Sequence, residues 1–105
     1  MTHSEFITQI AQRLVKTYSP LEIYLFGKDA WEVDEDPDDI DVKIIVQASA
    51  ETNQADRAES GYKALADLGC EEMFIEIFTK DEFATMAKEQ ALTFVLTQKY
   101  GTKIY

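Results

Sequence analysis

The sequence is poor in residues that several common classes of protein require. Cys70 is the single cysteine among 105 residues, so no disulfide can form within the chain and a reducing, cytoplasmic location is expected. The single histidine, His3, lies near the start, which predicts no Ser–His or Cys–His nucleophile and no zinc site. Ten Lys and Arg against twenty Asp and Glu give a net charge of −10, so we expect no direct binding to nucleic acid or to an anionic membrane surface.

Long apolar runs are also missing. The longest strongly apolar stretches, at 44–46 and 94–96, are far shorter than the roughly 20 residues that span a bilayer. The first residues carry no basic segment followed by an apolar one, so no signal peptide is expected. The 46% of hydrophobic residues is nevertheless typical of globular proteins, and the length fits a single domain over residues 1–105.

Hydrophobic spacing predicts helices and strands along the whole chain. Apolar residues at intervals of three and four predict helices over 4–18, over 55–68, and over 79–100 in one or two pieces. Short apolar runs predict strands over 21–26, 40–46 and 73–78. The order helix, strand, strand, helix, strand, helix predicts an α/β or α+β domain in which helices pack on a small sheet.

Residues at the predicted helix ends are typical of caps. Ser4 is the predicted N-cap of the first helix, and Gly69 is placed to end the second. Thr79 followed by Glu82 matches a capping box, which predicts that the third helical segment begins there. Gly101 is placed to end that segment.

Two carboxylates stand out at the start of the second predicted strand. Asp39 and Asp41 flank Ile40, and residues two apart on a strand point to the same face, about 6–7 Å apart at Cα. Adjacent carboxylates repel unless a cation lies between them. Mg²⁺ is held by one or two carboxylates together with substrate phosphates, so this pair is a candidate metal site. The preceding acids at 34–36 are typical of a solvated loop.

Glu76 is a third carboxylate of interest, because it interrupts an otherwise apolar strand. An unpaired charge buried there would cost several kcal/mol, of the order expected for burying an ion. Glu76 therefore faces a cation, pairs with a Lys, or lies at a sheet edge. If the third strand lies beside the second, Glu76 could complete a site of three carboxylates.

The acidic run also resembles a calcium-binding loop, but its spacing does not fit an EF-hand. Counted from Asp34, the sixth position is Asp39 where Gly is needed, and the twelfth is Ile45 where Glu is needed. A simple Ca²⁺-binding acidic domain is kept as a third alternative, behind the two described next.

Several spaced motifs together resemble the minimal nucleotidyltransferases of the DNA polymerase β-like nucleotidyltransferase superfamily. They are Leu-Phe-Gly at 25–27, Asp-Ile-Asp-Val at 39–42, Glu76 in the third strand, Phe-Thr-Lys-Asp-Glu-Phe at 78–83, and the terminal Gly-Thr-Lys-Ile-Tyr. The resemblance covers nearly the whole chain. It implies a nucleotidyltransferase fold, with a small mixed sheet of three or more strands and helices mainly on one face.

The resemblance also implies an activity, which is transfer of a nucleoside monophosphate from an NTP, expected to be ATP, to an acceptor hydroxyl. By position, Asp39, Asp41 and Glu76 would hold two Mg²⁺ ions, with Glu76 also activating the acceptor, and Gly27 with Lys28 would contact the phosphates. Members of this family act as antitoxins beside helical HEPN-type ribonuclease toxins, and an acidic chain suits a basic, RNA-binding partner.

One loop departs from the family pattern and leaves two functions open. Where the family has Gly-Ser-x-Ala-x-Gly, this chain has Gly-Lys-Asp-Ala-Trp-Glu at 27–32, so Lys28 replaces the serine and Glu32 the second glycine. A lysine binds phosphate as a point charge, which is compatible with an altered but active site. Lys28 could equally neutralise Asp39 or Asp41. The chain would then be a catalytically degenerate acidic module that neutralises its partner by binding alone, with Trp31 as a contact residue.

Overall fold

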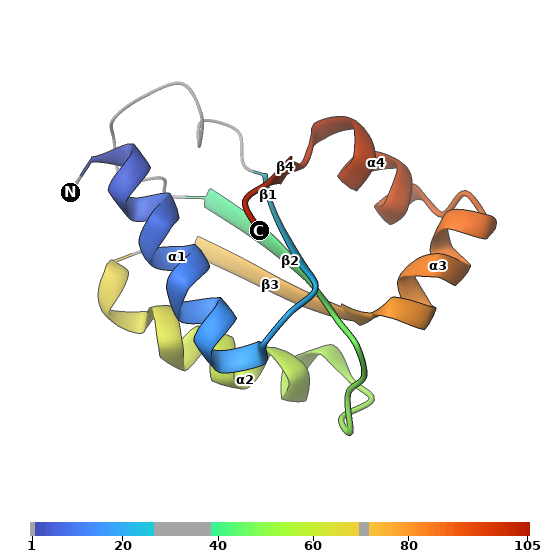
Figure 1. Cartoon of the computed structure of the whole chain (residues 1–105), viewed down its shortest axis with the longest axis horizontal. Coiled ribbons are helices and arrows are strands. Elements are labelled where there is room, and N and C mark those ends of the chain that lie inside the picture. The colour runs from blue at the N-terminus through green and yellow to red at the C-terminus, as the bar shows by residue number, and fades with distance from the viewer. Residues whose placement is uncertain (1, 27–38, 70–71) are drawn as a thin grey trace.

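The computed structural model describes residues 2–26, 39–69 and 72–105, which form a small sheet with helices packed against it (Figure 1). In chain order they are α1 (His3–Tyr18), β1 (Glu22–Phe26), β2 (Asp39–Val46), α2 (Gln54–Leu65), the short 3-10 helix η1 (Ala66–Leu68), β3 (Glu72–Thr79), α3 (Lys80–Lys88), α4 (Leu92–Tyr100) and β4 (Thr102–Lys103). The predicted elements are all present within one or two residues. The two-residue strand β4 was not predicted.

The four strands form one mixed sheet in the order β3-β2-β1-β4. β1 runs antiparallel to both β2 and β4, whereas β2 and β3 are parallel. The parallel pair needs a crossover connection, and α2 supplies it. The predicted mixed α/β architecture is confirmed, and the third predicted strand does lie beside the second.

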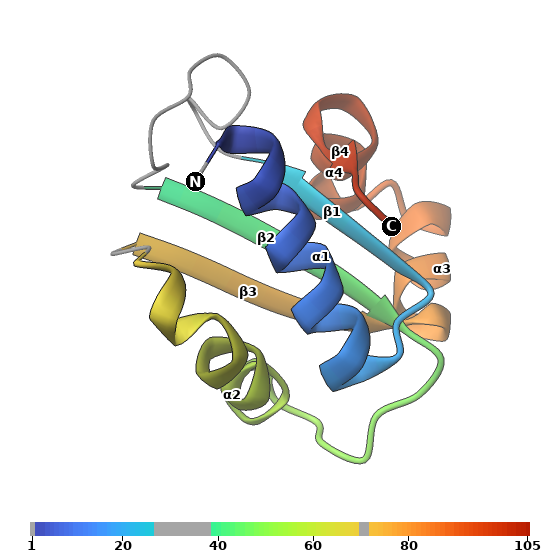
Figure 2. The same cartoon turned by 60° about the vertical axis from the view of Figure 1, so that its left-hand side comes forward.

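The hydrophobic core lies on the face of the sheet that α1 and α2 cover (Figure 2). Alternate residues of the strands point to this face, and they meet apolar residues spaced along one side of each helix. The buried members of this core are Phe6, Ile10, Leu14, Ile23, Leu25, Val42, Ile44, Val46, Ala58, Leu65, Ile75 and Ile77. The two longest helices therefore lie together on one face, as expected.

The shorter helices α3 and α4 lie against the opposite face, at the end where β3 finishes (Figure 2). Phe83 of α3 connects them to the sheet, because its ring lies 6.4 Å from that of Tyr24 and 6.5 Å from that of Phe78. It also meets Phe94 of α4 edge-on at 5.1 Å. Among the described residues, the aromatic cluster covers only this end of the face and does not cover Phe74 near the start of β3.

The helix caps follow the sequence with one correction. α1 begins earlier than expected, and its N-cap is Thr2, whose hydroxyl accepts from the Glu5 N–H at 3.1 Å, instead of Ser4. Thr2 and Glu5 are three residues apart, the spacing at which an N-cap side chain accepts from the N–H at the third helical position. The helix therefore begins about half a turn earlier than predicted. The capping box at Thr79 is confirmed. Gly69 adopts a left-handed conformation with φ of 78° directly after η1, and so ends that helical segment as predicted.

Candidate functional site

The candidate site lies on the sheet face opposite the core. Strand alternation brings Tyr24, Lys43 and Glu76 into one row across β1, β2 and β3, because Lys43 is in register with both of the others. In the next row towards the start of β2, Asp41 is in register with Phe74. The Phe74 side chain is 68% exposed, which shows that this part of the face is open to solvent.

Lys43 and Glu76 form an ion pair in the middle of this face. The Lys43 ammonium donates to the Glu76 carboxylate, and the two side chains are 10% and 35% exposed respectively. Sequence analysis left three surroundings open for Glu76. The structure shows two of these three surroundings at once: Glu76 pairs with a lysine, and its strand β3 is an edge strand.

The two aspartates stand at the start of the same central strand. β2 begins at Asp39, whose backbone is in register with Glu72, and Asp41 follows two residues later with a partly exposed side chain. Glu76 lies one strand across and two residues further along than Asp41. Strand spacing and rise place the Cα atoms of such diagonal neighbours about 8 Å apart, so Asp41 and Glu76 are near each other without being directly opposite.

Part of the predicted site falls on residues that the structure does not describe. Gly27 and Lys28, the predicted phosphate contacts, lie outside the described residues, together with Trp31, the acidic run at 32–38 and Cys70. The Asp39 side chain is likewise outside them, although its backbone is placed in β2. The spatial relation of the phosphate loop to the carboxylates is therefore still a prediction.

The described part of the candidate site has carboxylates of the kind that bind a divalent cation, but it contains no complete set of ligands. Within residues 2–26, 39–69 and 72–105, no three His, Cys, Asp or Glu side chains gather closely enough to hold a metal ion. Asp41 and Glu76 carry carboxylate oxygens, the ligands that Mg²⁺ prefers, and both side chains are partly exposed on the same face. Lys43 stands on the same face and already engages Glu76. Sequence analysis had overlooked this lysine, although it is the one charged residue inside the apolar run 42–46.

A second polar cluster lies at the β1 side of the face. The Tyr24 hydroxyl donates to the Glu22 carboxylate, and Lys103 Nζ of β4 lies 3.3 Å from Glu22 Oε2. Burial, followed by the hydrogen bond and charge of Glu22, raises the pKa of Tyr24 from 10.0 to about 12. Tyr24 therefore stays protonated at neutral pH and acts here as a hydrogen-bond donor.

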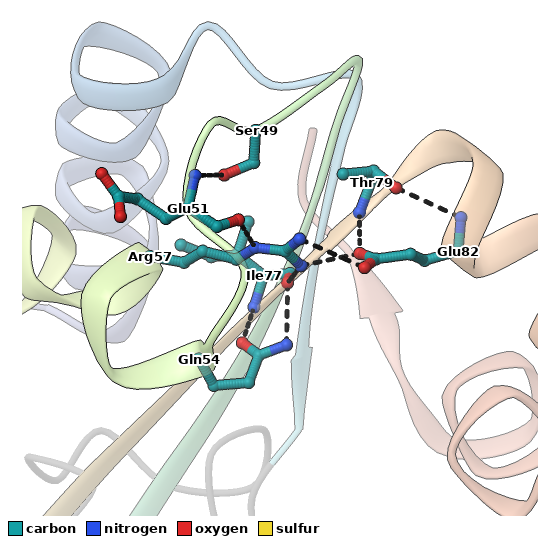
Figure 3. Close-up of polar contacts among 7 residues, drawn as sticks. All are labelled: Ser49, Glu51, Gln54, Arg57, Ile77, Thr79 and Glu82. Carbon is teal, nitrogen blue, oxygen red and sulfur yellow. Dashed lines mark hydrogen bonds and ion pairs between the residues drawn. The ribbon is translucent and has the colours of Figure 1, made fainter.

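Arg57 forms a separate polar network that links α2, β3 and α3 (Figure 3). Its side chain is 6% exposed and donates to the Glu51 carbonyl at 2.8 Å, to the Ile77 carbonyl at 2.9 Å, and to both carboxylate oxygens of Glu82 at 2.6 and 3.1 Å. The guanidinium, with help from the Thr79 N–H, lowers the pKa of Glu82 from 4.5 to about 2. Sequence analysis did not identify this residue either.

This network is structural in character. A hollow of about 460 Å³ lies beside it, with Phe78, Thr85 and Met86 in its wall. Arg57 is part of the same wall, but four of its five N–H donors already bond protein acceptors. Gln54 of the same helix bonds both backbone groups of Ile77, at 2.7 and 2.9 Å (Figure 3). The network thus attaches α2 along the outer edge of β3.

Comparisons with models of protein families, with curated proteins and with solved structures give no match for this chain. Among the helices that the structure describes, none is long and apolar enough to cross a membrane.

Proposed function

We propose that this chain is a minimal nucleotidyltransferase, which binds an NTP with Mg²⁺ at the start of β2 and transfers a nucleoside monophosphate to an acceptor hydroxyl. The observation that supports the proposal most is the position of the aspartates. Asp39 and Asp41 open the central strand, which lies beside the parallel strand that carries Glu76. The face that Asp41 shares with Glu76 is exposed at Phe74.

The role proposed for each site residue follows from the chemistry of that residue. Asp39 and Asp41 bind Mg²⁺, and Glu76 is the third carboxylate and the base for the acceptor. Gly27 and Lys28 contact the phosphates, because a lysine can bind phosphate as a point charge and glycine allows close backbone approach. Bound Mg²⁺, two ions in the proposed complex, neutralises charge on the phosphates and orients them.

The proposed reaction exchanges one bond at the α-phosphorus of the NTP for another. The acceptor oxygen forms a bond to the α-phosphorus, and the bond from that phosphorus to the bridging oxygen breaks, so pyrophosphate leaves. The acceptor proton moves to the Glu76 carboxylate. ATP is the proposed donor.

The proposed biological role is that of an antitoxin to a helical HEPN-type ribonuclease toxin. The net charge of −10 supports it, since an RNA-binding partner is basic and opposite charges speed association. A pull-down at low and high salt tests this part separately, because charge-driven capture must weaken as salt screens it.

Calorimetric titration with ATP, with and without Mg²⁺, tests the binding step without knowledge of the acceptor. We expect Mg²⁺-dependent binding that is lost in the Asp39→Asn/Asp41→Asn variant. The matched control is Glu59→Gln/Glu89→Gln, which removes two exposed carboxylates elsewhere and makes the same change in net charge. Absence of binding for all four NTPs, or equal binding by both variants, contradicts the proposal.

A second function is favoured by one specific observation, the ion pair between Lys43 and Glu76. A lysine that already neutralises the third carboxylate suits a degenerate site, in which the chain acts as an acidic binding module. Capture of the same partner by the wild type and by Asp39→Asn/Asp41→Asn, with no ATP binding by either, supports the binding module over the enzyme.

A further inference from the structure

We propose that the outer side of α4 is a self-association surface, through which two copies of this chain pair as an antiparallel, two-fold symmetric dimer. The side chains that form this surface, the α4 face, are those of Leu92, Val95, Leu96, Lys99 and Tyr100. The inference is independent of the proposed function, because it concerns a helix that carries none of the proposed site residues.

Helix α4 has apolar side chains on both of its sides. On the inner side, Phe94 meets Phe83 of α3 edge-on, with the ring centres 5.1 Å apart. On the outer side, Leu92 is 71% exposed, Leu96 41% and Tyr100 61%. A helix that is apolar all round is normally covered on every side. Within the described part of the chain, the outer side of α4 does not have the cover that its composition calls for.

The exposed apolar side chains of the protein are concentrated on this helix. Among the described residues, eight large hydrophobic side chains are exposed, and half of them lie in α4 at intervals of three and four, on one side of the helix. Figure 1 shows α4 with α3 at the side of the molecule away from α1 and α2. Single exposed hydrophobic residues are normal on a monomer, whereas a continuous apolar patch marks an interaction site.

The distribution of charge favours a second copy as the partner. Residues 90–105 contain two Lys and no Asp or Glu, so all twenty acidic residues precede them. Two copies, each with a net charge of −10, repel each other wherever their acidic surfaces meet, and this acid-free segment is where they can approach. A basic partner would instead be attracted to the acidic remainder of the chain.

The two ends of α4 carry opposite charges, which fits an antiparallel pair. Glu89 is exposed in the turn that leads into the helix, and Lys99 is exposed in its last turn. When two copies of α4 lie antiparallel about Leu96, the last turn of each helix lies beside the first turn of the other. Lys99 of each copy then approaches Glu89 of the other, so a two-fold axis forms two ion pairs at once.

This pairing also accounts for a lysine among apolar side chains. The Lys99 Nζ lies 5.3 Å from the centre of the Tyr100 ring, within the α4 face. Covering the face with an apolar surface alone would take this ammonium out of water without compensation, which is unfavourable. A carboxylate from the other copy supplies the compensation, and a parallel pair would instead bring like charges together.

Sedimentation of the wild type, Leu96→Glu and Leu21→Glu tests the surface. Interfaces below about 1,200 Å² form weak complexes, so we expect a wild-type dimer that dissociates on dilution from about 1 mM to about 10 μM. Leu96→Glu should raise the dissociation constant at least about ten-fold, because it places two carboxylates at the symmetry axis. Leu21→Glu is the matched control, since Leu21 is 44% exposed between α1 and β1, and it should associate as the wild type does.

Charge reversal tests the orientation. Glu89→Lys and Lys99→Glu should each weaken the dimer about three- to ten-fold, because each brings like charges together at two places. An equal mixture of the two variants should associate as the wild type does, since each copy then supplies the charge that the other lacks. Glu89→Lys also reduces the net charge of the chain, so a weaker dimer in this variant does not come from general repulsion.

Three results overturn the inference. A wild type that stays monomeric at about 1 mM shows that the α4 face is not a self-association surface, and would leave it to a different protein. Equal association of the wild type and Leu96→Glu shows that the dimer forms elsewhere. A mixture of Glu89→Lys and Lys99→Glu that associates no better than either variant alone excludes the antiparallel arrangement.

A measurement on the wild type covers the case in which Leu96→Glu does not fold. Backbone amide signals are compared by NMR at the two ends of the same concentration range. We expect the signals of residues 92–100 to move with concentration, while that of Leu21 stays. Concentration-dependent changes confined to other elements overturn the inference.

Discussion

The hydroxyl of Tyr18 accepts a hydrogen bond from the Gly61 N–H at 2.7 Å and donates one to the Arg57 carbonyl at 2.7 Å. These two backbone groups are four residues apart in α2, the pair that a regular helix joins directly. The last residue of α1 thus inserts its side chain into the hydrogen bonding of α2. The contact is close, because a Cβ atom at Gly61 would lie 2.9 Å from the Tyr18 hydroxyl oxygen and 3.1 Å from Ile75.

Gly61→Ala should therefore destabilise the fold, although alanine is the better helix former in an isolated helix. The added methyl group pushes on the Tyr18 ring and Ile75, and such overpacking costs about 1–3 kcal/mol of unfolding free energy. Ala64→Gly, in the same helix, is the control for intrinsic propensity. Urea denaturation measures both. The explanation is wrong if Gly61→Ala is as stable as the wild type. It is also wrong if Gly61→Ala destabilises the Tyr18→Phe protein, which lacks the crowded hydroxyl, as much as it destabilises the wild type.

The Arg57–Glu82 pair should make stability depend on acid pH. The folded protein holds the pKa of Glu82 at about 2, below its ordinary 4.5, so the folded state resists protonation. The stabilisation is complete above pH 4.5 and is lost as pH falls towards 2. Because the Glu82 side chain is 45% exposed, we expect it to reach only about 1 kcal/mol and to shrink in salt.

Thermal unfolding of the wild type and Glu82→Gln between pH 2 and 7 measures this effect. The difference in melting temperature should be constant at neutral pH and should close as the pH approaches the folded pKa of Glu82. Glu89→Gln, an exposed carboxylate at the C-terminal end of α3, is the control for net charge. A difference that persists at the lowest pH would assign the stabilisation to packing.

Gln54→Ala should promote self-association as well as lower stability. Gln54 bonds the outward-facing N–H and C=O of Ile77, and the Tyr62 hydroxyl accepts from the Ile75 N–H at 3.0 Å. Removing the amide costs about 1–2 kcal/mol and uncovers part of the β3 edge. Light scattering with heating should show aggregation at lower temperature than for Gln90→Ala, whose exposed amide bonds only within its own helix end.

Two phenylalanines on the same side of the sheet should lose very different amounts of stability when they are truncated. Phe83→Ala breaks ring contacts with Tyr24, Phe78 and Phe94, and should cost about 2–4 kcal/mol. Phe74→Ala removes a ring that is 68% exposed and should change stability by less than about 0.5 kcal/mol. Denaturation with guanidinium compares them. A large cost for Phe74→Ala would mean that this part of the face is covered.

The elements were predictable from sequence because each has a clear local signal. The α1 and α2 core positions follow helical spacing, and the Thr79 capping box fixes the start of α3. β4 escaped prediction because two residues, Thr102 and Lys103, carry no periodicity. It forms through pairing with β1, which is a property of the assembled sheet.

The sequence limited the surroundings of Glu76 to three possibilities but could not distinguish among them. Its partner depends on the register of β3 against β2, and a shift of one residue would turn it to the other face. One signal was available, since Lys43 and Glu76 are each the single charge within an apolar run, and two such charges on neighbouring strands tend to pair. The aspartates at the start of β2 were found because their spacing is local.

The order of α2 and β3 along the chain has a consequence for synthesis. Gln54, Arg57 and Tyr62 all precede the strand whose edge they cover. A ribosome completes the helix before β3 emerges, so the strand can meet its covering side chains as soon as it is made. The outward N–H of Ile75 and both outward backbone groups of Ile77 are then bonded early, so a neighbouring nascent chain has fewer free groups to which it could add a strand.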